Sequence, residues 1–219
     1  MKKIHHLGEA RSAIDNYMAD LRNVDVQTDR AMFRENIRRV GRAIGLEISK
    51  TLDYKEVLIT TPLAKHGQFQ LGDEVVVITI LRAGLPMHEG ILDVFPKAEN
   101  GFISAYRKHD ADGSFTIDVG YVACPSLEGK VLILNDPMLA TGASFENAMY
   151  ALKEYGKPKA LHLAAVIASQ YGVNALDKSF GDDVELWVAA IDPELNEDKY
   201  IVPGLGDAGD LCFGPKLQS

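Results

Sequence analysis

The feature that most constrains the fold is a series of short runs of Val, Ile and Leu that alternate with segments of helical spacing. Strands buried on both faces of a parallel sheet are apolar at consecutive positions, and helices supply the crossovers between them. The sequence therefore predicts an α/β fold with a mostly parallel sheet flanked by helices. The runs are KEVLITTPL (55–63), EVVVITIL (74–81), KVLILN (130–135), ALHLAAVIAS (160–169) and VELWVAAI (184–191), and the helical segments are 85–95, 144–155 and 170–178.

Two further regions complete this predicted architecture. Residues 7–52 have helical spacing, with Thr28 as a candidate N-cap before an apolar face that begins at Met32. FISAYR (102–107) and SFTIDVGYVA (114–123) have no helix between them and predict a hairpin excursion. Because no linker or internal repeat interrupts the pattern, we expect one domain over residues 1–219.

Composition excludes several classes of protein. The net charge of -8 argues against a nucleic-acid binder, because affinity for a phosphate backbone needs clustered Lys and Arg. Cys124 and Cys212 lack metal-ligand spacing and are predicted to be reduced packing thiols. No apolar run is long enough to predict a membrane span or a leader segment, so the expected compartment is the cytoplasm.

The end of the run VLILN carries the first candidate site. In open parallel sheets, ligands bind beyond the carboxyl ends of the strands. Here Asp136 is followed by small residues that enter a helix, whose first turn is expected near Ser144. The N–H groups and dipole of a helix start favour phosphate, and the hydroxyls of Thr141 and Ser144 can add donors. The chain has no Walker motif, and the simpler alternative is a plain strand-loop-helix connection capped by Ser144.

Two arginines also stand at the ends of predicted strands. Arg82 follows ITIL, and Ala83 and Gly84 keep the backbone after it accessible. Arg107 ends FISAYR and precedes a polar segment that could be a mobile lid or an ordinary hairpin turn. An arginine fork can hold two oxygens of one anion, although a solvated strand-end arginine is the alternative.

The C-terminal segment KYIVPGLGDAGDLCFG (199–214) is the last candidate site. Its G-x-G-x-x-G pattern does not predict a dinucleotide site, because it follows Pro203 rather than a strand and no βαβ unit can follow it. What remains is a Gly-rich loop with two acids, Asp207 and Asp210. Its exposed backbone could present donors and acceptors to a flat polar ligand.

Together, the motifs ILRAGL, YR, DPMLATGAS and YIVPGLGDAGD resemble the uracil phosphoribosyltransferases, a type I phosphoribosyltransferase family, in order and over nearly the whole chain. Pro137, where most phosphoribosyltransferases carry a second acid, and the long C-terminal motif are similar to the uracil branch. The resemblance implies the type I phosphoribosyltransferase fold, with an N-terminal helical region and a C-terminal base-binding loop. It also implies a glycosyltransferase of pyrimidine salvage that converts uracil and 5-phosphoribosyl 1-pyrophosphate into UMP and pyrophosphate.

The same resemblance implies roles for individual residues. Arg82 and Arg107 would bind the pyrophosphate side of the donor, and Asp136 the ribose hydroxyls. Asp207 would face the donor or its Mg²⁺, and the catalytic residues would be Arg107, Asp136 and Asp207. The phosphoribosyl site would further include Pro137, Met138, Leu139, Ala140, Thr141, Gly142, Ala143 and Ser144, while uracil would meet Ile201, Gly206, Asp207 and Ala208, largely through backbone atoms.

The resemblance also implies the cofactor and the assembly. Mg²⁺ would be bound mainly through pyrophosphate, without a direct protein ligand. The partners would be the two small-molecule substrates and further copies of the chain, in a dimer or a larger homo-oligomer, with neither nucleic acid nor membrane. The N-terminal helical region is one candidate for the pairing surface.

The sequence departs from the family pattern at several positions. Asn135 stands where an apolar residue is usual, which is expected to alter only packing at the strand end. Ala143 replaces a glycine and is therefore expected to adopt negative φ. The segment KHDADGSFTID (108–118) lacks an acid-rich pattern, which bears on lid behaviour. Three histidines, His66, His88 and His109, fall outside the motifs and are expected to be surface or packing residues.

Two other functions remain open at this point. The first is a non-catalytic regulatory protein that binds uracil or UMP in the same pocket; the leaving-group arginines argue against it. The second is a phosphoribosyltransferase that acts on another base, which Pro137 and the C-terminal motif disfavour.

Overall fold

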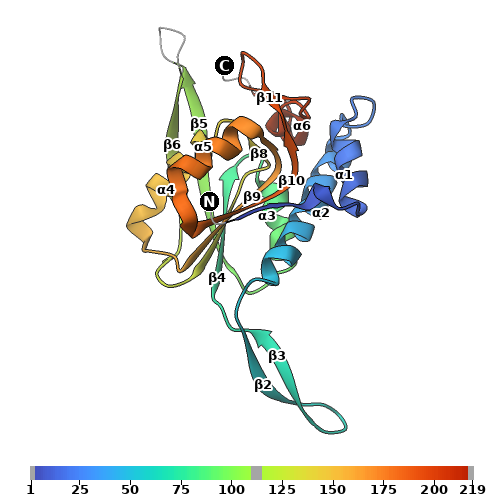
Figure 1. The fold of residues 1–219 in the computed structure, drawn as a ribbon, viewed down its shortest axis with the longest axis vertical. Helices are drawn as coiled ribbons and strands as arrows, with labels where there is room; N and C mark the ends of the chain where they lie inside the picture. Colours follow the sequence, from blue (N-terminus) through green and yellow to red (C-terminus); the bar gives the residue numbers. More distant parts are fainter. Residues whose placement is uncertain (1–2, 110–114, 217–219) are drawn as a thin grey trace.

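The structure, a computed structural model, describes residues 3–109 and 115–216, without the side chains of 105–109, 115–119 and 183. Within that part, an eight-stranded sheet in the order β1-β10-β9-β7-β4-β5-β6, with β8 beside β9, forms the centre (Figure 1). All neighbours are parallel except β5 and β6, so the predicted mostly parallel sheet is confirmed. The strands are β1 (Lys3–His6), β4 (Val75–Leu81), β5 (Glu99–His109), β6 (Phe115–Ala123), β7 (Val131–Asn135), β8 (Met138–Leu139), β9 (Ala160–Ser169) and β10 (Val184–Asp192).

Helices cover both faces of this sheet (Figure 1). On one face lie α1 (Ala13–Arg22), α2 (Arg30–Ser49) and α3 (Leu85–Leu92), and on the other α4 (Ala143–Leu152) and α5 (Gln170–Phe180). Val75 and Val77 of β4 pack into the first core, while Val76 and Ile78 pack into the second. Because successive side chains of a strand point to opposite faces, two cores require the continuous apolar runs seen in the sequence.

The N-terminal region is divided more finely than predicted. It contains β1, the 3-10 helix η1 (Leu7–Glu9) and two helices. The N-cap of α2 is Asp29, whose Oδ1 accepts hydrogen bonds from Ala31 N and Met32 N, so the choice of Thr28 was wrong. The carboxylate one residue further along satisfies two of the free amide groups at the helix start.

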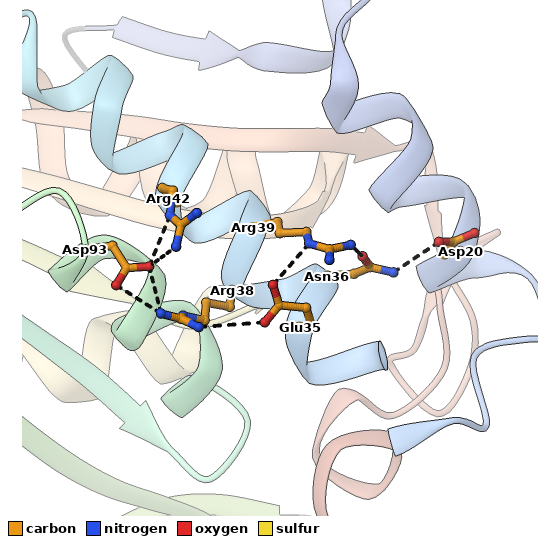
Figure 2. A network of polar contacts seen from close by, with 7 residues as sticks. All are labelled: Asp20, Glu35, Asn36, Arg38, Arg39, Arg42 and Asp93. Atoms are coloured by element: carbon orange, nitrogen blue, oxygen red, sulfur yellow. Dashed lines mark hydrogen bonds and ion pairs between the residues drawn. The ribbon is translucent and has the colours of Figure 1, made fainter. Parts of the chain in front are cut away.

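A network of polar side chains joins these helices (Figure 2). Asp93, at the end of α3, accepts hydrogen bonds from Arg38 and Arg42 of α2. Asn36 of α2 in turn donates to Asp20 of α1, at 3.2 Å. The three helices are therefore linked by polar contacts as well as through their apolar core.

A two-stranded hairpin lies apart from the main sheet. β2 (Tyr54–Thr60) pairs antiparallel with β3 (Lys65–Leu71), and the pair projects from the end of the molecule opposite the C-terminus (Figure 1). KEVLITTPL was predicted as a strand, but its partner KHGQFQL was not, since it contains few apolar residues. Leu58 and Phe69 of this hairpin are 69% and 64% exposed, so it contributes little to either core.

The carboxyl ends of the parallel strands face the C-terminal elements (Figure 1). These are β11 (Glu194–Leu195), its antiparallel partner β12 (Ile201–Val202), and α6 (Ala208–Phe213). The predicted β5-β6 hairpin is confirmed and projects from the same end. The remaining 3-10 turns are η2 (Lys153–Tyr155) and η3 (Gly181–Asp183). Among the helices described, none has the length and hydropathy needed to cross a membrane.

Candidate active site

Asp136 lies directly beyond β7, whose five residues are all buried. Its Oδ1 accepts a hydrogen bond from Met138 N at 3.3 Å, and its own N–H donates to Ala164 O. Burial raises the pKa of Asp136 to about 7; the hydrogen bond from Met138 opposes this rise and the negative charge of Asp207 adds to it. The carboxyl therefore titrates near neutral pH, where a nearby cation would favour its ionised form.

Asn135 does more than fill the strand end. It is fully buried, its Nδ2 donates to Ile78 O at 2.9 Å, and its Oδ1 accepts from Thr79 Oγ1 at 2.9 Å. The expectation of a packing change alone was therefore incomplete. This polar link ties β7, which leads into Asp136, to β4, which leads into Arg82.

The residues after Asp136 run along β9. Pro137 O accepts from Val166 N and Ile167 N, and β8 continues this pairing. Ser169 Oγ then donates to Ala140 O at 2.5 Å. The predicted phosphate loop is consequently held by the backbone of a central strand along its first half.

α4 begins at Ala143, one residue before the expected start. Its N-cap is Gly142, which has φ of 90° and makes no capping side-chain hydrogen bond. Ala143 avoids positive φ, as expected, because Gly142 takes that conformation instead. Ser144 is thus not the cap but lies in the first turn, where the amide groups and the dipole can receive a phosphate. Thr141 Oγ1 already accepts from Ala143 N at 3.4 Å.

Arg82 follows the last residue of β4 through a cis peptide bond. Its Nη2 donates to Gly214 O at 3.2 Å and lies 3.6 Å from Asp210 Oδ1, and the guanidinium carbon is 6.0 Å from the ring centroid of Phe213. Its side chain is 44% exposed. Because exposed ion pairs of this length are weak, a bound anion can replace them at little cost.

The backbone of Arg107 belongs to β5, but its side chain lies outside the described residues. β5 pairs with β4 up to Ser104, which is opposite Leu81. Arg107 is three residues further along the hairpin, opposite Ile117 of β6. The role implied for Arg107, and any lid behaviour of the following segment, stay predictions.

The Gly-rich C-terminal loop turns sharply before α6. Gly204 and Gly206 have φ of 64° and 90°, a region that disfavours side chains. Asp207 is the N-cap of α6, with its Oδ1 accepting from Asp210 N at 3.0 Å. Ile201 and Ala208 are buried. These two glycines therefore make the turns of a loop, as predicted from the sequence, and do not form a dinucleotide-binding motif.

These loops meet at one edge of the sheet. The charge of Asp207 acts on Asp136, and the charges of both Asp207 and Arg82 act on Cys212 in α6. Met138, Ala140, Ile201 and Ala208 belong to one apolar cluster. The structure therefore brings together the phosphate loop, the C-terminal loop and Arg82.

Two of the three histidines lie where they were expected. His88 is buried in α3, where desolvation lowers its pKa and its Nε2 is 2.6 Å from Asn100 Oδ1. His66 is exposed on β3. The side chain of His109 lies outside the described residues.

Sequence reasoning missed Arg22 and Asp192, which lie beside the C-terminal loop. Arg22 ends α1 and forms an ion pair with Asp192 at 2.8 Å. Asp192 is the last residue of β10 and follows an apolar run, as Asp136 follows β7. That shared position was the signal that could have marked it.

The side chains near the site offer few ligands for a metal ion. Within the described residues, no group of three or more His, Cys, Asp or Glu side chains could hold a metal ion. Asp136 and Asp207 supply two carboxylates that repel each other. Oxygen donors of this kind suit Mg²⁺, which commonly takes one or two carboxylates together with phosphate oxygens.

Comparisons with known proteins identify the family. The sequence model of the family described as uracil phosphoribosyltransferase matches residues 9–215. The uracil phosphoribosyltransferase of Porphyromonas gingivalis is 47% identical over 98% of this chain and 100% of its own length. That of Methanococcus vannielii is 43% identical over 92% of this chain and 86% of its own.

A solved structure has a similar fold along the full chain. It is the AQ2163 protein of Aquifex aeolicus, with a TM-score of 0.87 and 29% identity over 98% of this chain and 99% of that one. The family match covers both loops of the candidate site and the strands that carry them. The chain belongs to the uracil phosphoribosyltransferase family.

Proposed function

We propose that the chain transfers the phosphoribosyl group of 5-phosphoribosyl 1-pyrophosphate to uracil, giving UMP and pyrophosphate in pyrimidine salvage. The observation that carries this proposal is the meeting of a phosphate loop and a Gly-rich C-terminal loop at one sheet edge, in a member of this family. The relatives from Porphyromonas gingivalis and Methanococcus vannielii both bear the name of this activity.

The reaction separates charge, and the site residues match that separation. The bond from the ribose C1 to the pyrophosphate oxygen breaks with its electron pair on pyrophosphate, and uracil N1 forms the new bond to C1 and loses its proton. Cationic character develops on the ribose, where the carboxylate of Asp136 stabilises it. Arg82 and Arg107 offset the negative charge of the leaving pyrophosphate.

The ribose 5-phosphate is assigned to the start of α4. The segment from Thr141 to Ser144 combines a glycine N-cap, the amide groups of a first helical turn and two hydroxyls. Its small residues let phosphate approach the backbone. Uracil is assigned to the loop with Ile201, Gly206 and Ala208, where backbone groups recognise a flat polar ring.

Mg²⁺ is the proposed cofactor. The ion would be bound mainly through pyrophosphate, with Asp207 facing the donor or the ion. A divalent cation would also offset the charge of Asp207, which adds to the effect of burial in raising the pKa of Asp136. When bound, the ion neutralises charge on the pyrophosphate. Most of its ligands would come from the substrate and from water, in line with the small number of carboxylates nearby.

Assembly into a dimer or larger homo-oligomer, in the cytoplasm, is also part of the proposal. The β2-β3 hairpin extends from the body and exposes large apolar side chains, including Leu58, Leu63 and Phe69. Such a cluster is typical of a surface that another chain covers. Two free cysteines, Cys124 and Cys212, are compatible with a reducing compartment.

The test is UMP formation from uracil, 5-phosphoribosyl 1-pyrophosphate and Mg²⁺, with cytosine, hypoxanthine and orotate as comparison bases. Uracil-selective product is the expected result. Product from a comparison base would instead identify an enzyme for that base. Binding of UMP without any turnover would identify a regulatory protein and overturn the proposal.

A further inference from the structure

The ion pair between Arg22 and Asp192 has the geometry of a rigid fork. Arg22 Nη1 donates to Asp192 Oδ2 and Arg22 Nη2 donates to Asp192 Oδ1, both at 2.8 Å. Arg22 is the last residue of α1 and Asp192 the last residue of β10. The pair therefore joins the N-terminal helix to the sheet edge where the site lies.

Both partners also bind the same residue of the C-terminal loop. Arg22 Nη1 donates to Gly204 O at 2.9 Å, and Gly204 N donates to Asp192 Oδ2 at 2.7 Å. The backbone donor and acceptor of Gly204 are thus held by two side chains that also hold each other. A Cβ at Gly204 would collide with Ile201 O, so the loop closes tightly on itself at this point.

A third side chain extends the attachment by one residue. Gln27, in the turn after α1, donates from Nε2 to Leu205 O at 3.3 Å and to Leu21 O at 2.9 Å. Leu205 itself is 3% exposed. Gly204 and Leu205 are therefore both anchored to the N-terminal helix, immediately before the residues assigned to uracil.

The other end of the attachment is fixed by the sheet. Asp192 pairs with Ser169 of β9 in the parallel register, and Ser169 Oγ holds Ala140 O of the phosphate loop. Two adjacent strand ends thus hold the two loops of the site. A shift of the C-terminal loop would move it relative to the phosphate loop and so misalign the two substrates.

Burial makes the pair sensitive to loss of either member. The side chain of Asp192 is 7% exposed and that of Arg22 26%. Burial by itself would raise the pKa of Asp192, but the hydrogen bonds from Arg22 and Gly204 and the charge of Arg22 outweigh it and hold that pKa below its ordinary value. Asp192 is accordingly a buried carboxylate that depends on its partner.

We infer that Arg22 and Asp192 are positioning residues for uracil, which set the place of the 201–208 loop through Gly204 rather than by touching substrate. This inference rests on the proposed function, since the loop is assigned to uracil there. Arg22→Lys keeps the positive charge but cannot donate to both oxygens of Asp192 and to Gly204 O in the same planar geometry. Asp192→Asn keeps an oxygen that can accept from Gly204 N but loses the negative charge. Either change should loosen the loop, which also carries Asp207, while leaving the phosphate loop in place.

The kinetic test measures KM for each substrate in both variants. We expect KM for uracil to rise about 10-fold, the effect of losing about one net hydrogen bond to the bound base, while KM for 5-phosphoribosyl 1-pyrophosphate, which meets only Asp207 of this loop, rises by less than about 3-fold. Arg11→Lys is the matched control, since Arg11 is 90% exposed and pairs with Asp15 at 3.1 Å outside the site. It should leave both constants unchanged. Equal changes in both KM values, or none, would overturn the inference.

Amide hydrogen exchange of residues 201–209 in the free protein provides a readout that needs no turnover. We expect faster exchange there in Arg22→Lys and Asp192→Asn, and the wild-type rate in Arg11→Lys. If the wild type made no UMP, the proposed function would fail, but hydrogen exchange would still show whether Arg22 and Asp192 hold the 201–208 loop in place. If one variant failed to fold, the other would carry the test; unchanged exchange in a folded variant would contradict it.

Discussion

Asp136 and Asp192 occupy similar places and have opposite environments. Each follows a buried apolar run at the carboxyl edge of the same sheet. Asp192 accepts a fork from Arg22, and its pKa lies below the ordinary value although burial opposes this. Asp136 faces burial and the negative charge of Asp207, and its pKa is raised to about 7. The strand-end position brings a carboxylate to this edge of the sheet, and its neighbours decide whether its pKa is raised or lowered.

Asp93 is an aspartate carboxylate in a third kind of environment, on the surface of the protein. It accepts hydrogen bonds from Arg38 and Arg42 on the outer face of the helices (Figure 2). Its side chain is 29% exposed, against 7% for Asp192. Water and salt screen such surface pairs, so the two arginines at Asp93 do not make it more important than Asp192, which has one.

Replacing Asp192 should have the largest effect. Asp192→Ala leaves the half-buried Arg22 and the Gly204 amide without their acceptor. Removing one partner of a buried ion pair typically lowers the free energy of unfolding by about 3–5 kcal/mol. Urea denaturation at pH 7 measures this change. If the free energy of unfolding fell by only about 1 kcal/mol or less, as for an exposed ion pair, the burial of Asp192 would not make its ion pair important for stability.

Replacing Asp136 should mainly affect turnover. Asp136→Asn removes the charge that stabilises the cationic ribose and should lower kcat by about 100-fold. Because the carboxyl of the free wild-type protein has a pKa of about 7, kcat/KM for 5-phosphoribosyl 1-pyrophosphate should rise as pH increases through 7, whereas the variant should lack this step. Activity profiles from pH 5.5 to 8.5 test both points. Identical profiles in the two proteins would exclude Asp136 as the titrating group.

Stability should respond to pH in opposite directions at the two carboxylates. The raised pKa of Asp136 means that the native state binds its proton more tightly than the unfolded chain. Stability is therefore lost as pH rises from about 4 to about 7. Residue 136 is only partly buried, so solvent screens part of its charge. Above pH 7, Asp136→Asn should therefore be more stable than the wild type by roughly 2 kcal/mol.

Asp192 should show the reverse dependence. Its lowered pKa adds stability that is present above the unfolded value near 3.8 and is lost as pH falls through the folded value. Asp192→Asn should therefore lose stability relative to wild type at pH 7 and less at acidic pH. Denaturation of the wild type and both variants at pH 3 and pH 8 measures these two dependences, and the same pH dependence in both variants would contradict them.

Asn135 offers a smaller test of how the strand ends are held. Asn135→Leu leaves Ile78 O and Thr79 Oγ1 without their side-chain partner in a buried place. We expect the free energy of unfolding to fall by about 1–2 kcal/mol. The double variant Thr79→Val with Asn135→Leu removes both polar side chains and should recover part of this loss. Thermal unfolding measures both, and an Asn135→Leu protein as stable as wild type would show that the link contributes nothing.

The surface network should give the smallest effect. Asp93→Ala removes the contacts with Arg38 and Arg42 at an exposed position. The expected loss is about 1 kcal/mol or less, and it should shrink further at high salt. Thermal unfolding at 0.05 and 0.5 M salt measures it. If the free energy of unfolding fell as much as in Asp192→Ala, burial would not explain why the two sets of arginine contacts differ in importance.

Sequence reasoning found the sheet and most of the site because both depend on local patterns. β4, β7, β9 and β10 were predicted from apolar runs that two cores require, and Asp136 and Arg82 from their places after those runs. The missed elements carry weak patterns: β1 has one apolar residue, Ile4, and β3 alternates poorly. Helix starts were displaced by one residue, at Asp29 and Gly142, because capping depends on backbone geometry.

The sequence by itself determined the alternation of strands and helices, the small residues after Asp136 and the glycines of the C-terminal loop, since each is a local requirement of backbone and burial. The tertiary structure alone decided which charges meet. Arg22 and Asp192 are separated by 170 positions and have no spacing that a pattern can show. Likewise, the pKa of Asp136 depends on Asp207 and on desolvation, which exist only when distant segments pack together.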